Sequence, residues 1–367
     1  MLNGIRVVEF EGLGPGPFCG MLLADLGADV IVIHRPTANE VPGMGGDNLL
    51  DRGKRSITLD LKTPEDKATA LALIATADAL IEGNRPGVME RLGLGPAECQ
   101  AVNPALVYGR MTGWGQTGPL AQVAGHDLNY IGRSGALWYA AAPGAAPLTP
   151  PTLVGDIGGG ALYLAVGILS GVLNARATGT GTVVDAAIVD GSAHMMALLM
   201  SLRAAGGVVT ERGQSLLDGP HWSRSYPCAC GAWIVVQALE PKFYRLFLQG
   251  LGLAEDADMI AGHYDRAAWP GLTDRIAALF ASQPRAHWEA VFAASDACVA
   301  PVLSPDQAAA DPHIAARGIW SADPVQPAPA PRFDGQRRSP GPIPARGANS
   351  AELRAELAKK SADGQVS

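Results

Sequence analysis

Short apolar segments alternate with helix-like segments through the first third of the chain, and this alternation restricts the fold more than any other feature. The strand-like segments span residues 4–10, 28–33, 56–61, 79–82 and 106–110. Helical patterns separate several of them, at residues 18–26 and 63–76. Strands that alternate with helices of this length form βαβ units, and the strands of such units lie parallel. We therefore predict an α/β fold with a Rossmann-like large domain built on a parallel sheet.

The pattern changes in the later part of the chain. An uncharged segment at 157–175 predicts a buried core helix rather than a membrane span, because it contains glycines and an asparagine. A strand at 182–189 and a Met-rich helix at 194–202 follow it. Farther on, a strand at 233–237 precedes amphipathic patterns at 241–251 and 272–292, which indicates a smaller α+β domain.

These patterns give a domain assignment. We assign residues 1–200 to the large domain, 225–310 to the small domain, and 201–224 and 311–324 to linkers. The segment 324–344 is dense in Pro, Gly and Arg and predicts an extended arm. A short helix at 351–359 follows, and residues 325–367 are expected to complete the large domain.

Charge and cysteine content exclude several functional classes. The chain has 28 Lys and Arg against 35 Asp and Glu, a net charge of −7, which argues against a nucleic-acid-binding protein. Its 5 cysteines do not form a disulfide scaffold and favour a reducing, cytoplasmic setting. Cys228 and Cys230 are too closely spaced for a zinc site, so we expect two half-buried thiols beside a turn and no metal. Charges within the first apolar run argue against a signal peptide, and we expect no membrane association.

Basic residues gather in one part of this acidic chain. They fall within or beside loops at the ends of the predicted strands, where open α/β sheets bind ligands. Guanidinium groups recognise phosphate through paired hydrogen bonds, so the cluster suits a small molecule bearing several phosphates. A scattered, solvated face is an equally good interpretation. The cluster comprises Arg52, Lys54, Arg55, Lys62, Arg85 and Arg91.

The turn after the first strand does not have the spacing of a dinucleotide-binding motif. Gly12, Gly14 and Gly16 stand at alternate positions, and two prolines remove N–H groups that would face a pyrophosphate. Glu9 and Glu11 flank this turn. We interpret them as a solvated or hydrogen-bonded strand end rather than as a catalytic pair.

Two short segments carry candidate catalytic groups. His126 precedes Asp127 at an expected helix start, where a histidine can act as a base and backbone N–H groups can stabilise an oxyanion. Asp156 stands among glycines before the long apolar segment. The residue pattern alone leaves it as an N-cap or as a catalytic carboxylate, and favours the N-cap.

Several motifs together resemble the class III CoA-transferase superfamily, and within it the α-methylacyl-CoA racemases. They are distributed from the first strand to the region of residues 311–313. The matching segments are 27–30, 60–62, 85–93, 111–119, 125–130, 155–156, 184–187, 240–244 and 296–299.

The resemblance implies roles for individual residues. In such racemases, residues at the positions of His126 and Asp156 act on opposite faces of the substrate α-carbon: one removes the α-proton of a 2-methylacyl-CoA thioester and the other returns a proton. Glu240 would orient His126, and the N–H of Asp127 would stabilise the enolate. The carboxyl group of Asp156 would need a raised pKa to serve as an acid. CoA is part of the substrate, and no separate cofactor or metal is implied.

The resemblance also implies a CoA site and an assembly. The large domain would bind the CoA nucleotide, and the whole would be an interlocked homodimer with a role in lipid metabolism. The residues that we assign to phosphate and adenine contacts are Arg35, Arg52, Arg55, Lys62, Arg85 and Arg91.

Two alternatives stand beside the racemase. A CoA-transferase would move CoA between carboxylic acids through an adduct on Asp156. A CoA-binding protein without catalysis would bind CoA and exchange no proton. Among the other histidines, His34, His263, His287 and His313 are expected at the surface or in loops, and His194 in helix packing.

Overall fold

The computed structural model describes residues 1–37, 48–322 and 325–362. Residues 323–324 of the predicted linker and 363–367 of the predicted C-terminal segment lie outside the described residues. Contacts divide the chain into two units. Unit 1 comprises Met1–Leu137, Thr149–Met195 and Pro327–Ser367, and unit 2 comprises Trp138–Leu148 and Met196–Gln326. Unit 2 thus takes in residues 138–148 and the segments that were predicted to be linkers.

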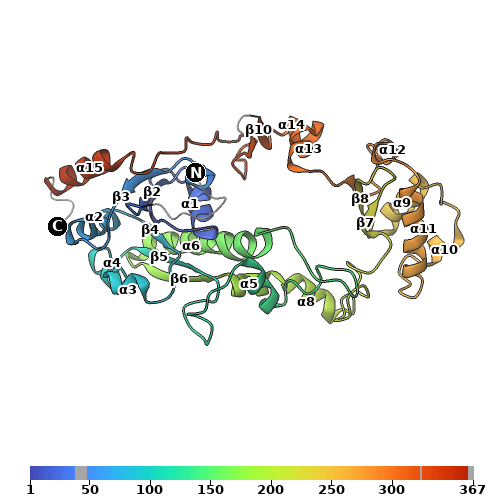
Figure 1. The fold of residues 1–367 in the computed structure, drawn as a ribbon, viewed down its shortest axis with the longest axis horizontal. Helices are drawn as coiled ribbons and strands as arrows, with labels where there is room; N and C mark the ends of the chain where they lie inside the picture. The colour runs from blue at the N-terminus through green and yellow to red at the C-terminus, as the bar shows by residue number, and fades with distance from the viewer. Residues whose placement is uncertain (38–47, 323–324, 363–367) are drawn as a thin grey trace. The chain divides into compact units, whose positions relative to one another are not determined.

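Unit 1 is built on a six-stranded sheet in the order β3-β2-β1-β4-β5-β6 (Figure 1). Every neighbouring pair is parallel. This is the Rossmann strand order, and it confirms the predicted α/β class. The order reverses between β1 and β4, and in such sheets ligands bind outside the carboxyl ends of the strands at that reversal. The strands are β1 Arg6–Phe10, β2 Asp29–His34, β3 Arg55–Thr58, β4 Ala79–Glu82, β5 Val107–Thr112 and β6 Thr182–Ala187.

Helices cover both faces of this sheet. On one face α1 and α6 pack against alternate side chains of the strands, such as Val7 and Ile81. On the other face α2, α3, α4 and the C-terminal α15 pack against Val8, Ile33 and Leu80. Both faces of the strands are apolar because both are covered. The helices of unit 1 are α1 Pro15–Asp25, α2 Pro64–Ala75, α3 Val88–Leu92, α4 Pro96–Val102, α5 Asp127–Ser134, α6 Leu162–Thr178, α7 Ile188–Met195 and α15 Ser350–Ala362, with a short 3-10 turn η1 at Leu49–Asp51.

The long apolar segment forms two kinds of helix. Residues Leu153–Ala161 form a π-helix, η2, which continues directly into α6. The combined stretch Leu153–Thr178 has the length and composition of a membrane-spanning helix, with 39% of its most apolar window buried. Within unit 1 it packs against β5 and β6, so it is a core helix on one side only. Its other side exposes Leu162, Val166 and Leu173.

Unit 2 contains a small antiparallel sheet in the order β7-β8-β9, with helices around it. Its core is aromatic and includes Trp222, Tyr226 and Phe280. The predicted helix at 272–292 is wrong as one element, because Pro284 separates two helices; the predicted helix at 194–202 is likewise divided at Met196. The elements are α8 Ala197–Ala204, β7 Ser223–Pro227, β8 Trp233–Gln237, α9 Pro241–Gly250, α10 Ala257–Ala261, α11 Trp269–Ala281, α12 Arg285–Val291, β9 Val299–Pro301, α13 Pro305–Ala310, α14 Pro312–Ala316, β10 Trp320–Ala322 and β11 Val325–Pro327.

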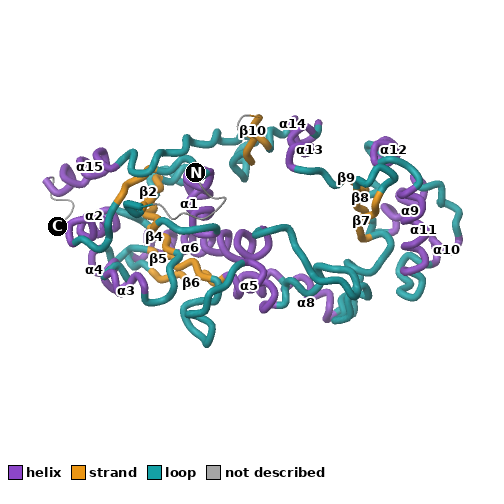
Figure 2. Tube along the Cα trace, in the orientation of Figure 1, coloured by secondary structure: helices purple, strands orange, loops and turns teal. Residues whose placement is uncertain are grey.

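The C-terminal arm runs as irregular chain from β11 to α15, apart from a single bridge between Phe333 and Gln336 (Figure 2). It is held to the sheet edge at β3, where Ser56 accepts from the Gly347 N–H and donates its own N–H to Asn349. Helix α15 adds ion pairs from Glu356 to Arg6 and Arg55. The arm and α15 are therefore held to β3 and to Arg6 of β1.

Candidate functional site

Asp156 lies inside the π-helix η2, on its first turn. The predicted N-cap role is wrong, because the residue at the N-cap is Thr152. A π-helix widens the backbone, and such turns are frequent at functional sites. The carboxylate lies beside the β1–α1 turn, since a Cβ atom built on Gly14 would be 3.6 Å from Asp156 Oδ2. Asp156 therefore stands beside the carboxyl end of β1, at the reversal point of the sheet.

The carboxylate of Asp127 holds the backbone around Asp156. Its Oδ1 accepts hydrogen bonds from the N–H groups of Gly155 at 3.0 Å and of Asp156 at 2.9 Å. Asp127 is itself buried at the start of α5. A Cβ atom on residue 155 would come within 2.4 Å of Asp127 Oδ1, so this contact requires glycine. The role of the Asp127 side chain was not predicted. The only indication in the sequence was an acidic residue at an expected helix start.

The environment of Asp156 raises its pKa to about 6. Burial is the main cause, and the charge of Asp127 adds to it, whereas His126 opposes it. A carboxyl group with such a pKa exists in both protonation states near neutral pH. It can therefore accept a proton or donate one, as the predicted acid–base role requires.

His126 immediately precedes α5 and is exposed. Its backbone N–H donates to Asn129 Oδ1 at 2.9 Å, which fixes the start of the helix. Asp127 is the first residue of α5, so its N–H is among the first-turn groups that have no acceptor within the helix. The structure thus brings together three of the predicted catalytic residues: His126, Asp127 and Asp156.

Aromatic side chains support the start of α5. The Tyr130 hydroxyl donates to the carbonyl of Gly125, and its ring meets Trp114 edge-on with centroids 4.8 Å apart. Burial raises the pKa of Tyr130; the Asp156 charge adds to this and Arg85 opposes it. Arg85 therefore lies within electrostatic reach of this centre.

Glu240 belongs to unit 2. It is exposed at the N-cap of α9, and its side chain makes no capping bond there. Its predicted hydrogen bond to His126 stays a prediction.

A pocket of about 490 Å³ opens at the carboxyl ends of the first strands. Its cations are Arg35 and Lys62, both exposed, which follow β2 and β3. Apolar side chains from the strands and α3 form its floor, including Leu59 and Met89. An apolar floor with cations at the rim suits a base and its phosphates. The lining residues are Phe10, Glu11, Ile33, His34, Arg35, Pro36, Thr37, Leu59, Asp60, Leu61, Lys62, Asn84, Val88, Met89 and Leu92.

Two of the predicted phosphate ligands, Arg52 and Arg55, form ion pairs within the fold. Arg52 is buried, and its guanidinium donates to the Asp25 carboxylate at 2.6 and 3.2 Å and to a backbone carbonyl. Arg55 forms ion pairs with Asp29 and with two glutamates of α15. The structure therefore does not support either residue as a phosphate ligand. Arg85 and Arg91 are exposed, as the prediction requires.

Lys54, Glu9 and Asp51 form a buried charge network beside β1. The Lys54 ammonium is 2.8 and 2.7 Å from the two oxygens of Glu9, and 3.6 Å from Asp51. Burial raises the pKa of Glu9 to about 7, although Lys54 acts to lower it. His34 joins the network through Asp51 and through Ser56, 2.8 Å from its Nδ1. Glu9 is hydrogen-bonded, which was one of its two predicted environments, whereas His34 was expected at the surface or in a loop and is instead buried at the end of β2.

The histidines and cysteines of unit 2 lie in different environments. His263 is buried against Tyr244, and His221 lies in the core of unit 2 rather than in a linker. Cys228 is buried and Cys230 exposed beside the β7–β8 turn. Among the described residues, no group of three or more His, Cys, Asp or Glu is arranged to hold a metal.

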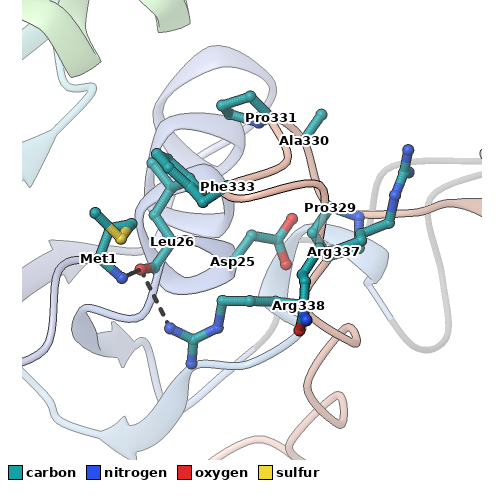
Figure 3. A pocket seen from close by; sticks show the side chains of 10 residues that line it. Met1, Asp25, Leu26, Pro329, Ala330, Pro331, Phe333, Arg337 and Arg338 are labelled. Carbon is teal, nitrogen blue, oxygen red and sulfur yellow. Dashed lines mark hydrogen bonds between the residues drawn. The ribbon is translucent and has the colours of Figure 1, made fainter.

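A second cavity of about 170 Å³ lies where the arm crosses the end of α1 (Figure 3). Arg338 donates to the carbonyl of Leu26 there, and the Met1 ammonium donates to the same oxygen. These polar groups tie the arm to α1, and we assign the cavity no ligand.

Comparisons with known proteins identify the family. The model of CoA-transferase family III matches residues 2–350. Alpha-methylacyl-CoA racemase of Mus musculus is 40% identical over 90% of this chain and 86% of its own. Succinate–glutarate CoA-transferase of Agrobacterium fabrum is 30% identical over 87% of this chain and 84% of its own. A CAIB/BAIF family protein from Brucella suis has a solved structure with a TM-score of 0.78 and 27% identity, covering 97% of this chain and 98% of that one. The chain belongs to CoA-transferase family III.

Proposed function

We propose that this protein interconverts the (R) and (S) forms of 2-methylacyl-CoA thioesters. His126 and Asp156 would face the α-carbon from opposite sides. One removes the α-proton, which leaves an enolate, and the other returns a proton to the opposite face. The observation that carries this proposal is the position of Asp156 beside the start of α5, where Asp127 Oδ1 accepts its backbone N–H and His126 lies within electrostatic reach; burial there raises the pKa of Asp156 to about 6.

The enolate requires fixed hydrogen-bond donors at its oxygen. The N–H of Asp127 is the proposed donor, because α5 begins there and the dipole of the helix favours negative charge at this end. Since the Asp127 carboxylate also holds the backbone of Asp156, one residue ties the proposed oxyanion site to the proposed base.

The CoA nucleotide would occupy the pocket at the ends of β1–β3. Arg35 and Lys62 line it and are the proposed phosphate ligands, with Arg85 and Arg91 as further cations nearby in the sequence. The family includes relatives named as CoA-transferases, which supports CoA as the carrier. The homodimer, the cytoplasmic location and the role in lipid metabolism stay predictions.

The test is to incubate the protein with one epimer of a 2-methylacyl-CoA in D2O, with no second carboxylic acid present. We expect deuterium at the α-carbon, by NMR, together with both epimers after hydrolysis. His126→Ala and Asp156→Asn should each abolish formation of the other epimer, although the remaining base can still exchange the α-proton of the epimer that it faces.

The CoA-transferase alternative gives a different result. It predicts no exchange for several acyl chains, CoA transfer once a free acid is added, and an Asp156 adduct that hydroxylamine traps. That outcome would refute the racemase. CoA binding without either reaction would indicate a protein that only binds CoA.

A further inference from the structure

Glu11 places a negative charge at the wall of the pocket that we assign to the CoA nucleotide. It follows β1 and lines the pocket together with Arg35 and Lys62. Its side chain is only 13% exposed. An unpaired carboxylate at this position would repel the phosphates that the two cations attract.

The carboxylate of Glu11 cannot easily turn away from the pocket. Its Oε2 accepts a hydrogen bond at 2.8 Å from the backbone N–H of Arg35, which ties the end of β1 to the segment after β2. The charge is therefore held in place by the same backbone that carries a proposed phosphate ligand.

Arg346 of the C-terminal arm neutralises this charge. Its guanidinium donates to both oxygens of Glu11, at 3.1 Å to Oε2. It also donates to the backbone carbonyl of Arg35 at 2.8 Å. Arg346 therefore contacts Glu11 and the backbone of Arg35 at the same time. Burial acts to raise the pKa of Glu11, but the bonds from Arg346 and from the Arg35 N–H hold that pKa below its ordinary value. Glu11 therefore carries its negative charge and Arg346 its positive charge.

We propose that Arg346 is a positioning residue for CoA binding, which acts by cancelling the charge of Glu11 at the nucleotide pocket. It does not line the pocket itself. It reaches Glu11 from a segment more than 300 residues distant in sequence, since the arm crosses this edge of the sheet. The inference rests on the proposed function of the pocket as the CoA nucleotide site.

The test measures CoA binding directly, by calorimetry on the full chain. For Arg346→Ala we expect the affinity for CoA to fall roughly tenfold, as removal of one neutralising charge near phosphates predicts. Arg346→Lys should restore most of it. The double variant Glu11→Gln/Arg346→Ala should also recover most of the affinity, because the repelling charge is then absent.

Arg338→Ala is the matched control. It removes an arginine of the same arm, which is hydrogen-bonded to Leu26 rather than to the pocket wall. We expect its CoA affinity to equal that of the wild type.

A kinetic readout adds a second criterion. With a 2-methylacyl-CoA, Arg346→Ala should raise KM and leave kcat unchanged; with the corresponding pantetheine thioester, which lacks the nucleotide, neither should change.

Two results would overturn the inference while leaving the proposed function intact. One is wild-type CoA affinity in Arg346→Ala. The other is no recovery in the double variant together with an equal loss in Arg338→Ala, which would assign Arg346 to arm attachment alone. A wild-type chain that does not bind CoA would instead overturn the proposed function, and this inference with it.

Discussion

Replacing Asp127 by Asn separates its charge from its hydrogen bonds. The Asn oxygen can still accept from the N–H groups of Gly155 and Asp156, which Asp127 Oδ1 does now. The other carboxylate oxygen is buried and has no hydrogen-bond partner among the described residues, so an amide NH2 there breaks no bond. The variant should therefore keep the backbone of η2 in place and remove one negative charge beside Asp156.

The expected effect is a lower pKa for Asp156. In the wild type this pKa is raised to about 6, with burial first and the Asp127 charge second among the causes. One like charge nearby contributes on the order of 1 kcal/mol, or roughly 0.7 pH unit. Burial remains in the variant, so the pKa of Asp156 should fall by about that amount and stay above the ordinary value of 3.8.

The assay is α-proton exchange in D2O as a function of pH. Below its pKa the Asp156 carboxyl group is protonated, so it cannot act as the base that removes the α-proton. The acid limb of kcat/KM should lie near pH 6 in the wild type and move to lower pH in Asp127→Asn. The same shift predicts how stability depends on pH. The folded state binds this proton more tightly than the unfolded state, so the free energy of unfolding should fall as pH rises from 3.8 to 6. The variant should weaken that fall.

Asp185→Asn is the control, because the Asp185 carboxylate also accepts a backbone N–H, from Gln116 at 2.9 Å, but is not among the groups that shift the pKa of Asp156. Its acid limb should stay at the wild-type position. An acid limb that is unchanged in Asp127→Asn, in a variant with wild-type melting temperature, would refute the electrostatic reasoning.

Three further predictions concern other contacts. Gly155→Ala places a methyl group 2.4 Å from Asp127 Oδ1, and should lower stability by about 1–3 kcal/mol in thermal unfolding and abolish proton exchange; full activity would contradict the described contact. Lys54→Met should cost about 3–5 kcal/mol in urea unfolding at pH 8, because the buried Glu9 then loses its paired cation and must either carry an uncompensated charge or take up a proton. The cost should be smaller at pH 5, since the pKa of Glu9 is already raised to about 7, and a cost independent of pH would argue against that assignment. Lys62→Ala should weaken CoA binding about tenfold in calorimetry, and an unchanged affinity would remove Lys62 from the site.

The sheet of unit 1 could be predicted from sequence because its strands are buried on both faces. Such strands appear as short continuous apolar runs, and the predicted segment 79–82 coincides with β4. In unit 2, 233–237 likewise coincides with β8. Helix boundaries were less accurate where a proline lies inside an amphipathic pattern. Periodicity continues across Pro284, whereas the backbone N–H that a helix needs at that position is missing.

The environments of individual basic residues could not be predicted from the sequence. Arg52 and Lys62 have equivalent positions in a linear pattern, in loops beside predicted strands. In the structure Arg52 is buried against Asp25, whereas Lys62 is exposed at the pocket. Local sequence does not distinguish them, because their partners come from elements elsewhere in the chain.

The sequence by itself determined the strand–helix alternation, the parallel sheet and the residues that resemble a family's catalytic set, since these depend on local periodicity and on short motifs. Only the tertiary structure decided the environment of each charge. It placed Asp156 in a π-helix, gave the Asp127 carboxylate two backbone N–H groups, and brought Arg346 to Glu11. Such contacts join segments far apart in the chain, and burial and neighbouring charges exist only once those segments have packed together.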